Sequence, residues 1–200
     1  MAEHICPVWA GYFLANRLRR LLHNPYRILE PYVKAGMMVL DIGPGMGFFS
    51  LPMAEMVGPQ GKVVCVDIQP GMLAALRRRA AKAGLPERIQ THLSSENAIG
   101  LEGRDNSFDF ALTFAMVHEV PDPAHLLAEV YRLLKGGAAL LLAEPVGHVT
   151  APDFERTLAL AGQAGFAETG RPQIRLSHAV VLVKPAVEPA PAHTSTAGGV

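Results

Sequence analysis

The chain has 200 residues, half of them hydrophobic, with 18 basic and 18 acidic side chains and no formal net charge. This length predicts one domain with a sizeable core, and the charge balance argues against a nucleic-acid partner, which requires a basic face. No apolar run approaches the roughly 20 residues that span a membrane, and the first residues lack a secretion signal. Two cysteines make no disulfide framework, so we expect a cytoplasmic protein.

Residues 1–36 precede the first predicted strand and contain two predicted helices. The first has leucines on one face and is expected to end at Asn24-Pro25. The second covers residues 28–33. Two interpretations stay open for this region: a helical buttress over a sheet edge, or a lid over a ligand cleft that includes residues 4–16.

From residue 37 on, strand and helix patterns alternate along the chain. The predicted strands are residues 37–42, 62–67, 88–93, 108–114, 138–143, a segment near Ile174, and residues 178–183. The predicted helices are residues 48–57, 70–83, 122–135 and 150–164, the third of them stopped by Gly136. This order predicts an α/β fold with a doubly wound, mostly parallel sheet over residues 37–184. Residues 185–200 are low in complexity and predict a disordered tail.

A glycine-rich turn follows the first predicted strand, in the run from Val39 to Gly47. Gly43, Gly45 and Gly47 alternate with other residues, and a helical pattern begins directly afterwards. Glycines allow positive φ and let a ligand approach the backbone closely, and the start of a helix offers unpaired N–H groups. The pattern therefore indicates a cofactor loop, although a tight turn between any strand and helix is the plainer alternative.

Phe48 stands where the dinucleotide-binding fingerprint requires a third glycine. The run 39–47 instead resembles the first motif of the class I S-adenosylmethionine-dependent methyltransferases. Residues 106–109, 117–123 and 133–137 resemble the small-molecule, quinone-biosynthesis-type branch of that family. The resemblance implies a Rossmann-like methyltransferase fold with seven strands, the seventh antiparallel, and S-adenosylmethionine as the cofactor.

Asp67 ends the second predicted strand, 20 residues after Gly47. At this distance a nucleotide-binding αβ unit places a carboxylate on the ribose hydroxyls, and one carboxylate can accept hydrogen bonds from both of them. The alternative is a helix cap, because Gln69-Pro70 begins a helical pattern.

The resemblance also assigns roles along the strand ends. It implies that Asp41 orients the glycine loop and the amine of the donor, that the loop contacts its methionine part, and that Ile68 and Met72 lie beside the adenine. The residues expected at the cofactor are Asp41, Gly43, Pro44, Gly45, Gly47, Asp67, Ile68, Met72, Met116 and one of Ser95 and Asn97.

The adenine contact has two candidates because the loop after the third predicted strand differs in length from the family pattern. Counting forward from that strand selects Ser95, and counting back from Phe108-Asp109 selects Asn97. Either side chain can accept from an amine, but neither is charged as the family's aspartate is. Helix capping is the alternative role.

His118 and Glu119 follow the fourth predicted strand and are the candidate catalytic residues, facing the acceptor beside Met116. His118 could act as a general base, or it could be a wall residue bonded to backbone; His148 is a second candidate. No metal site is predicted, because the spacing shows no convergent ligands. We therefore expect methyl transfer to a small molecule. The alternatives are a non-enzymatic S-adenosylmethionine-binding regulator or partner subunit, and a nicotinamide-dependent oxidoreductase.

Overall fold

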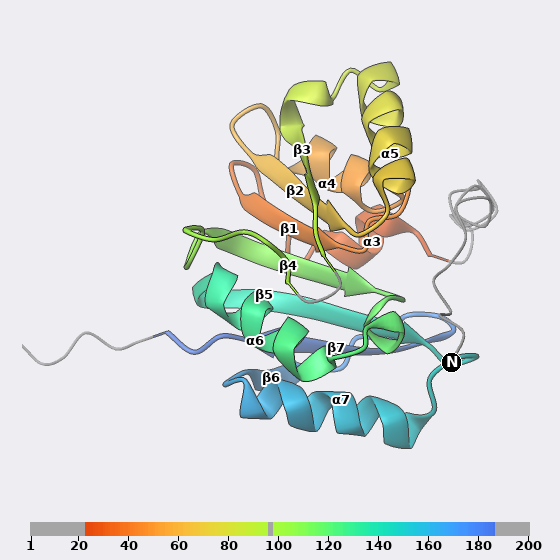
Figure 1. Cartoon of the computed structure of the whole chain (residues 1–200), viewed down its shortest axis with the longest axis vertical. Coiled ribbons are helices and arrows are strands. Elements are labelled where there is room, and N and C mark those ends of the chain that lie inside the picture. The colour runs from red at the N-terminus through yellow and green to blue at the C-terminus, as the bar shows by residue number, and fades with distance from the viewer. Residues whose placement is uncertain (1–22, 96–97, 187–200) are drawn as a thin grey trace, which may run out of the picture.

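The protein folds into one α/β unit in which strands and helices alternate, as Figure 1 shows for the computed structural model. The structure describes residues 23–95 and 98–186. The proposed lid segment, Asn97 and nearly all of the expected tail lie outside these residues. Within them the helices are α3 (Pro25–Leu29), α4 (Ser50–Met56), α5 (Pro70–Lys82), α6 (Pro123–Leu133) and α7 (Ala151–Gln163), with two 3₁₀ turns, η1 (Pro86–Arg88) and η2 (Val117–Glu119).

Seven strands form a single sheet in the order β3-β2-β1-β4-β5-β7-β6. Their bounds are β1 (Met38–Ile42), β2 (Lys62–Asp67), β3 (Ile89–Leu93), β4 (Phe108–Phe114), β5 (Leu134–Pro145), β6 (Ala167–Gly170) and β7 (Ser177–Val183). β7 pairs antiparallel with both β5 and β6, and the other pairs are parallel. The predicted fold class and the antiparallel seventh strand are therefore confirmed.

Helices cover both faces of the sheet, and each face has its own hydrophobic core. One core joins α3, α4 and α5 to the sheet and includes Leu29, Met53 and Leu76. The other joins α6 and α7 to the opposite face and includes Leu127 and Phe154. The central strands are apolar on both faces because parallel strands covered by helices are buried on both sides.

The segment before β1 differs from its prediction at Asn24-Pro25. This pair begins helix α3, because the Asn24 side chain accepts hydrogen bonds from the backbone N–H groups of Tyr26 and Arg27. Asparagine is a strong N-cap and proline suits the first helical position, where no N–H is needed. The predicted helix over residues 28–33 is therefore shifted toward the N-terminus.

The predicted stop of α6 at Gly136 is wrong. The helix ends at Leu133, and β5 begins at Leu134 without an intervening turn. Leu134 is fully buried and pairs with Phe108, and the ladder is irregular before it resumes at Ala139. The strand starts early because burial of Leu134 in the core outweighs the turn preference of the glycines that follow.

The sixth strand was also predicted in the wrong place, near Ile174. β6 lies earlier, at Ala167–Gly170, where most residues are exposed. An exposed edge strand lacks the apolar pattern by which strands are recognised in a sequence. Ile174 is buried from a loop instead, and the nearby Pro172 has no N–H to donate to a ladder.

Helices α6 and α7 begin as their capping residues predict, whereas α4 begins at Ser50, two residues later than predicted, and has no side-chain cap. The side chain of Asp122 accepts from the His125 N–H at the start of α6, and that of Thr150 accepts from the Asp153 N–H at the start of α7. Within residues 23–95 and 98–186, no helix combines the length and apolarity that crossing a membrane requires.

Candidate functional site

The glycine loop after β1 is a closely packed turn that depends on its glycines. Gly43, Gly45 and Gly47 have φ of 67°, 53° and 82°, in the left-handed region. A Cβ on Gly43 would lie 2.9 Å from the Met116 Cβ, and one on Gly47 would lie 2.2 Å from the Leu76 Cδ1. No side chain fits at these two positions, so the backbone itself forms this surface.

Asp67 ties the glycine loop to the end of β2. The Gly45 N–H donates to the Asp67 Oδ2 at 3.3 Å, and the Gln69 N–H donates to the Oδ1 at 2.9 Å. The residue is 8% exposed, and burial raises the pKa of its carboxyl group. Each carboxylate oxygen can accept more than one hydrogen bond, so Asp67 holds the turn that leads into α5 and keeps capacity for a ligand as well.

Asp41 lies beneath the loop, in β1, and is 3% exposed. The Ser50 Oγ at the start of α4 donates to its Oδ2 at 2.5 Å. Burial raises the pKa of Asp41 to about 7, the hydrogen bond from Ser50 opposes the rise, and the charge of Asp67 adds to it. Asp41 thus fixes the helix that follows the loop. Sequence reasoning missed Ser50, whose signal is a hydroxyl in the first turn after a glycine loop.

The other residues predicted beside the cofactor lie on both sides of this loop. The Pro44 carbonyl accepts from the Gly47 N–H at 2.9 Å and closes the turn. Ile68 is 38% exposed at the end of β2, where an apolar surface is open to a ligand. Met72 is buried in a small cluster with Met46 and Ala75, so it supports the loop from behind.

Ser95 follows β3 at the same edge of the sheet. Its N–H donates to the Ala98 carbonyl at 3.2 Å across a tight turn. Asn97, the other adenine candidate, lies outside the described residues. The adenine contact therefore stays a prediction for both.

Glu144, near the end of β5, organises the turn that follows β4. It is 1% exposed, and its Oε1 accepts from the N–H groups of Met116 at 3.2 Å and Val117 at 2.9 Å. Its Oε2 contacts the Nδ1 of His118. Sequence reasoning placed Glu144 at a strand end but gave it no role; its signal is an acidic residue that closes an otherwise apolar strand.

His118 and Glu119 both lie in η2, at the carboxyl edge of β4. The hydrogen bond to Glu144 raises the pKa of His118, partial burial opposes the rise, and the charges of Glu144 and Glu119 add to it. The ring of His148 stacks on that of His118, with centroids 5.6 Å apart and planes at 29°. The structure therefore brings together the two histidines that the sequence presents 30 positions apart.

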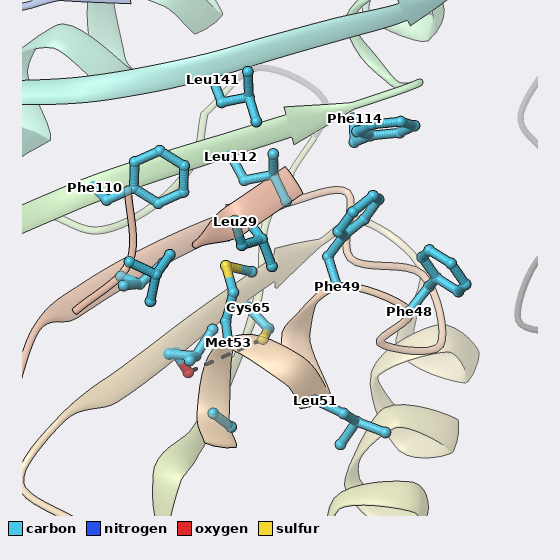
Figure 2. Packing of buried hydrophobic residues seen from close by; sticks show 14 of the residues in the cluster. Leu29, Phe48, Phe49, Leu51, Met53, Cys65, Phe110, Leu112, Phe114 and Leu141 are labelled. Atoms are coloured by element: carbon cyan, nitrogen blue, oxygen red, sulfur yellow. Dashed lines mark hydrogen bonds between the residues drawn. The ribbon is translucent and has the colours of Figure 1, made fainter. Parts of the chain in front are cut away.

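Aromatic side chains pack next to the glycine loop on the face of the sheet that carries α4. The ring of Phe49 lies 4.5 Å from that of Phe114 at the end of β4, and Phe48 packs edge-on against Phe49 at 5.0 Å. Figure 2 shows these three rings together at the end of the core cluster. Phe48, which replaces the third glycine of the dinucleotide fingerprint, is thus a packing residue and is 7% exposed.

A cavity of about 250 Å³ lies between the start of α7 and the start of β7. It is separate from the glycine loop, because β4 and β5 stand between β1 and β7 in the sheet. His178 in its wall pairs with Glu144 across the β5–β7 ladder. No cluster of three metal-ligating side chains occurs in the part of the chain that the structure describes.

Comparison with known proteins identifies the family of this fold and site. Residues 39–137 match the family described as "Methyltransferase domain". The chain is 35% identical over 150 residues to a ubiquinone/menaquinone biosynthesis C-methyltransferase UbiE of Hahella chejuensis, covering 71% of this chain and 59% of that protein. It is 34% identical over 124 residues to a demethylmenaquinone methyltransferase of Shouchella clausii, covering 62% of this chain and 51% of that protein. The chain spans about half the length of the curated relatives it matches.

Solved structures agree with this assignment. A SAM-dependent methyltransferase from Aquifex aeolicus superposes with a TM-score of 0.81 at 27% identity, over 90% of this chain and all of that one. The [4+2]-cyclase SpnF superposes with a TM-score of 0.69 at 18% identity, over 82% of this chain and 81% of that one, which is a likeness of fold alone. The glycine loop, the acidic end of β2 and these matches agree, and the chain belongs to the class I S-adenosylmethionine-dependent methyltransferases.

Proposed function

We propose that this chain transfers a methyl group from S-adenosylmethionine to a small-molecule acceptor. The observation that carries the proposal is the hydrogen bond between the Gly45 N–H and the Asp67 carboxylate. It joins the glycine loop to an acidic strand end in one rigid cradle. Such a cradle suits a ligand that presents hydroxyl groups to a carboxylate and a polar chain to the backbone.

The residues present fit this donor. Gly43 and Gly47 leave no room for a side chain of their own, so the loop offers bare backbone. Asp67 has acceptor capacity for two ribose hydroxyls, and Ile68 offers exposed apolar surface beside it for the adenine. Met116 packs against Gly43 and connects the donor loop to the turn after β4.

The donor supplies a methyl group bound to a positively charged sulfur, and the chain's own task is to hold the partners in line. Correct positioning of two reactants is worth up to about 7–11 kcal/mol in favourable cases. The rings of Phe49 and Phe114 pack together in the core behind the glycine loop and support its position. Glu144 fixes the turn of residues 116–118 after β4, and we expect Met116 and His118 to face the acceptor there.

The names of the relatives support a proposal for the acceptor class. Two of them are named as methyltransferases of ubiquinone/menaquinone biosynthesis and of demethylmenaquinone. For this chain we propose an acceptor of similar chemistry, an aromatic ring that carries hydroxyl groups. A soluble hydroquinone, 1,4-dihydroxynaphthalene, is therefore the first probe to test, beside an amine and a thiol.

Substitution of Asp67 tests the donor site. Hydrogen bonds to a charged group are worth about 1.5–3 kcal/mol each, and 1.4 kcal/mol is about tenfold in affinity. We expect Asp67→Ala to weaken S-adenosylmethionine binding by about tenfold to several hundredfold in isothermal titration. Asp67→Asn, which keeps an acceptor oxygen but loses the charge, should be intermediate.

The matched control is Asp105→Ala. The Asp105 side chain is 55% exposed and pairs with Arg132 of α6. Asp105 precedes β4 and therefore lies away from the carboxyl ends of the parallel strands. Unchanged donor affinity in a folded Asp67→Ala variant would remove Asp67 from the site. Binding of NAD in place of S-adenosylmethionine would favour the oxidoreductase alternative. Donor binding with no methylated product from any probe would favour the regulator alternative.

A further inference from the structure

Three backbone or side-chain donors of one turn converge on a single buried carboxylate. Glu144 accepts from the N–H groups of Met116 and Val117 through one oxygen and contacts the His118 ring through the other. The two backbone bonds alone would hold η2 in place, and a neutral amide could accept both. The second oxygen is therefore available to act on His118.

A carboxylate at Nδ1 determines the tautomer of the neutral imidazole ring. Burying a carboxylate is costly unless a donor or a positive charge faces it, so the contact favours a proton on Nδ1. In the neutral ring the lone pair then lies on Nε2. The His118 side chain is 24% exposed at the carboxyl edge, whereas that of Glu144 is only 1% exposed. No hydrogen bond to its Nε2 is found among the residues that the structure describes.

The surroundings of His118 come from four elements. Glu144 from β5 and Glu119 from η2 itself favour the protonated ring. His148, in the loop between β5 and α7, stacks on the His118 ring and restricts its rotation. His178 from β7 lies opposite Glu144 in the ladder. The ring is thus held by an orienting carboxylate on one nitrogen and by a second ring on its face.

We propose that His118 is the general base of the methyl transfer and that Glu144 is the positioning residue that keeps its Nε2 ready to accept a proton. This inference rests on the proposed function. The geometry matches that of other catalytic histidines, in which a buried carboxylate on Nδ1 selects the tautomer and the orientation of the ring.

With a hydroxylated aromatic acceptor, the step moves one proton to His118 and one methyl group to the acceptor. The His118 Nε2 takes the proton from an acceptor hydroxyl, and an electron pair of the acceptor oxygen, or of a ring carbon activated by it, forms the bond to the methyl carbon. The carbon–sulfur bond breaks, and its electron pair stays on the sulfur, which becomes neutral. Transfer to a ring carbon leaves a carbon-bound proton, which is lost to water as the ring regains its aromaticity. A phenolic hydroxyl has a pKa near 10, so a base is needed at neutral pH.

The first experiment determines the tautomer of the His118 ring and requires no methyl acceptor. Wild-type protein labelled with ¹⁵N-histidine is titrated by NMR, with His118 assigned by comparison with His118→Gln. We expect the neutral ring to carry its proton on Nδ1 and to titrate above 6.5. In Glu144→Gln the amide presents an N–H to the ring, so the proton should move to Nε2 and the pKa should fall. A neutral wild-type ring protonated on Nε2 would overturn the proposal, because that nitrogen could not act as a base.

The second experiment follows turnover of S-adenosylmethionine with 1,4-dihydroxynaphthalene. General-base catalysis contributes about 10²–10⁴-fold, so His118→Gln and Glu144→Gln should each lower kcat by about that factor while donor affinity stays unchanged. The wild-type rate should fall on the acid side of the His118 pKa, and this limb should be absent in His118→Gln. His125→Gln, an exposed histidine on α6, is the matched control.

The outcomes separate this inference from the proposed function. A folded His118→Gln variant that keeps the wild-type kcat and the same acid limb would refute the base. If the wild-type protein binds the donor but methylates no probe, the proposed function fails, and the tautomer measurement still decides the arrangement of His118 and Glu144. Melting curves of both variants exclude loss of fold as the cause of a lower rate.

Discussion

At the scale of single residues, the site holds three buried carboxyl groups that differ in the hydrogen bonds they accept. Asp41 receives one hydroxyl hydrogen bond, Asp67 receives backbone N–H groups, and Glu144 receives both backbone donors and a histidine. Among the described residues, the Asp41 carboxyl group accepts a hydrogen bond from Ser50 alone, and burial raises its pKa to about 7. A carboxyl group with so little compensation opposes folding once it ionises.

Asp41 should therefore make the stability of the protein depend on pH. Its pKa is 3.8 in an unfolded chain and about 7 in the fold, so the folded state holds the proton more tightly. The stabilising contribution is complete below pH 4 and is lost as pH rises through 7, by at most about 1.4 kcal/mol per pH unit. Urea unfolding should be measured for wild type and Asp41→Asn between pH 4 and 8. As pH rises, the free energy of unfolding of the wild type should fall relative to that of the variant.

Ser50→Ala provides a second measurement of the same group. The Ser50 hydrogen bond lowers the pKa of Asp41, so its removal should move the loss of stability to higher pH. Parallel stability curves for wild type and Asp41→Asn across this range would show that Asp41 is not the titrating group.

At the scale of elements, the glycine loop is held between two helices and the turn after β4. Gly47 is its most restricted position, because its φ is 82° and a Cβ would lie 2.2 Å from the Leu76 Cδ1. Leu76 is fully buried on α5, so an added Cβ would push against a side chain of the core. The loop conformation is therefore coupled to the packing of α5 on the sheet.

We expect Gly47→Ala to destabilise the protein by about 1–3 kcal/mol through overpacking, with roughly 1–2 kcal/mol more from the left-handed backbone. Gly58→Ala is the matched control, since φ is 67° there but no atom lies within 4 Å of the added Cβ. Gly58→Ala should be destabilised only by the strain of the left-handed backbone and should leave S-adenosylmethionine binding unchanged. Equal losses in the two variants, measured by thermal or urea unfolding, would contradict the predicted contact with Leu76.

At the scale of the whole molecule, Lys184 joins parts of the chain that are far apart in sequence. It follows β7 at the edge of the sheet opposite the glycine loop and is 8% exposed. Its Nζ donates to the carbonyls of Tyr131 at 2.9 Å and Leu134 at 2.8 Å and to the Asn106 Oδ1 at 2.7 Å. The ammonium group thereby closes the junction of α6 and β5 against the last strand. Burial lowers the pKa of Lys184.

Lys184→Met should destabilise the fold without affecting the site. It would leave two backbone carbonyls without their donor, at about 1–3 kcal/mol for each that stays buried. Urea unfolding should show this loss while titration shows unchanged donor affinity. Lys135→Met is the control: its Nζ lies 2.5 Å from the Asp109 Oδ1, but the side chain is 48% exposed, and such pairs are worth less than about 1 kcal/mol. A Lys184→Met variant as stable as Lys135→Met would contradict this role.

Much of the fold follows from local patterns in the sequence. The strands of the parallel core are continuous apolar runs, and β2 and β4 have the bounds that these runs predict. Proline and capping side chains predicted the starts of α5, α6 and α7. The spacing of Asp67 from Gly47 predicted that the two belong to one site, because a βαβ unit of fixed length connects them.

Other features were decided by tertiary structure alone. The sequence favoured the wrong segment for β6, because an exposed edge strand carries no apolar signal. It gave no reason to join Glu144 to His118 or Asp41 to Ser50, since each pair forms only when particular strands and helices become neighbours. The order β1-β4-β5 places the ends of β4 and β5 side by side. Hydrophobic periodicity shows that a strand is buried, but it does not say which strand lies beside it, and that neighbour determines which side chains meet at the site.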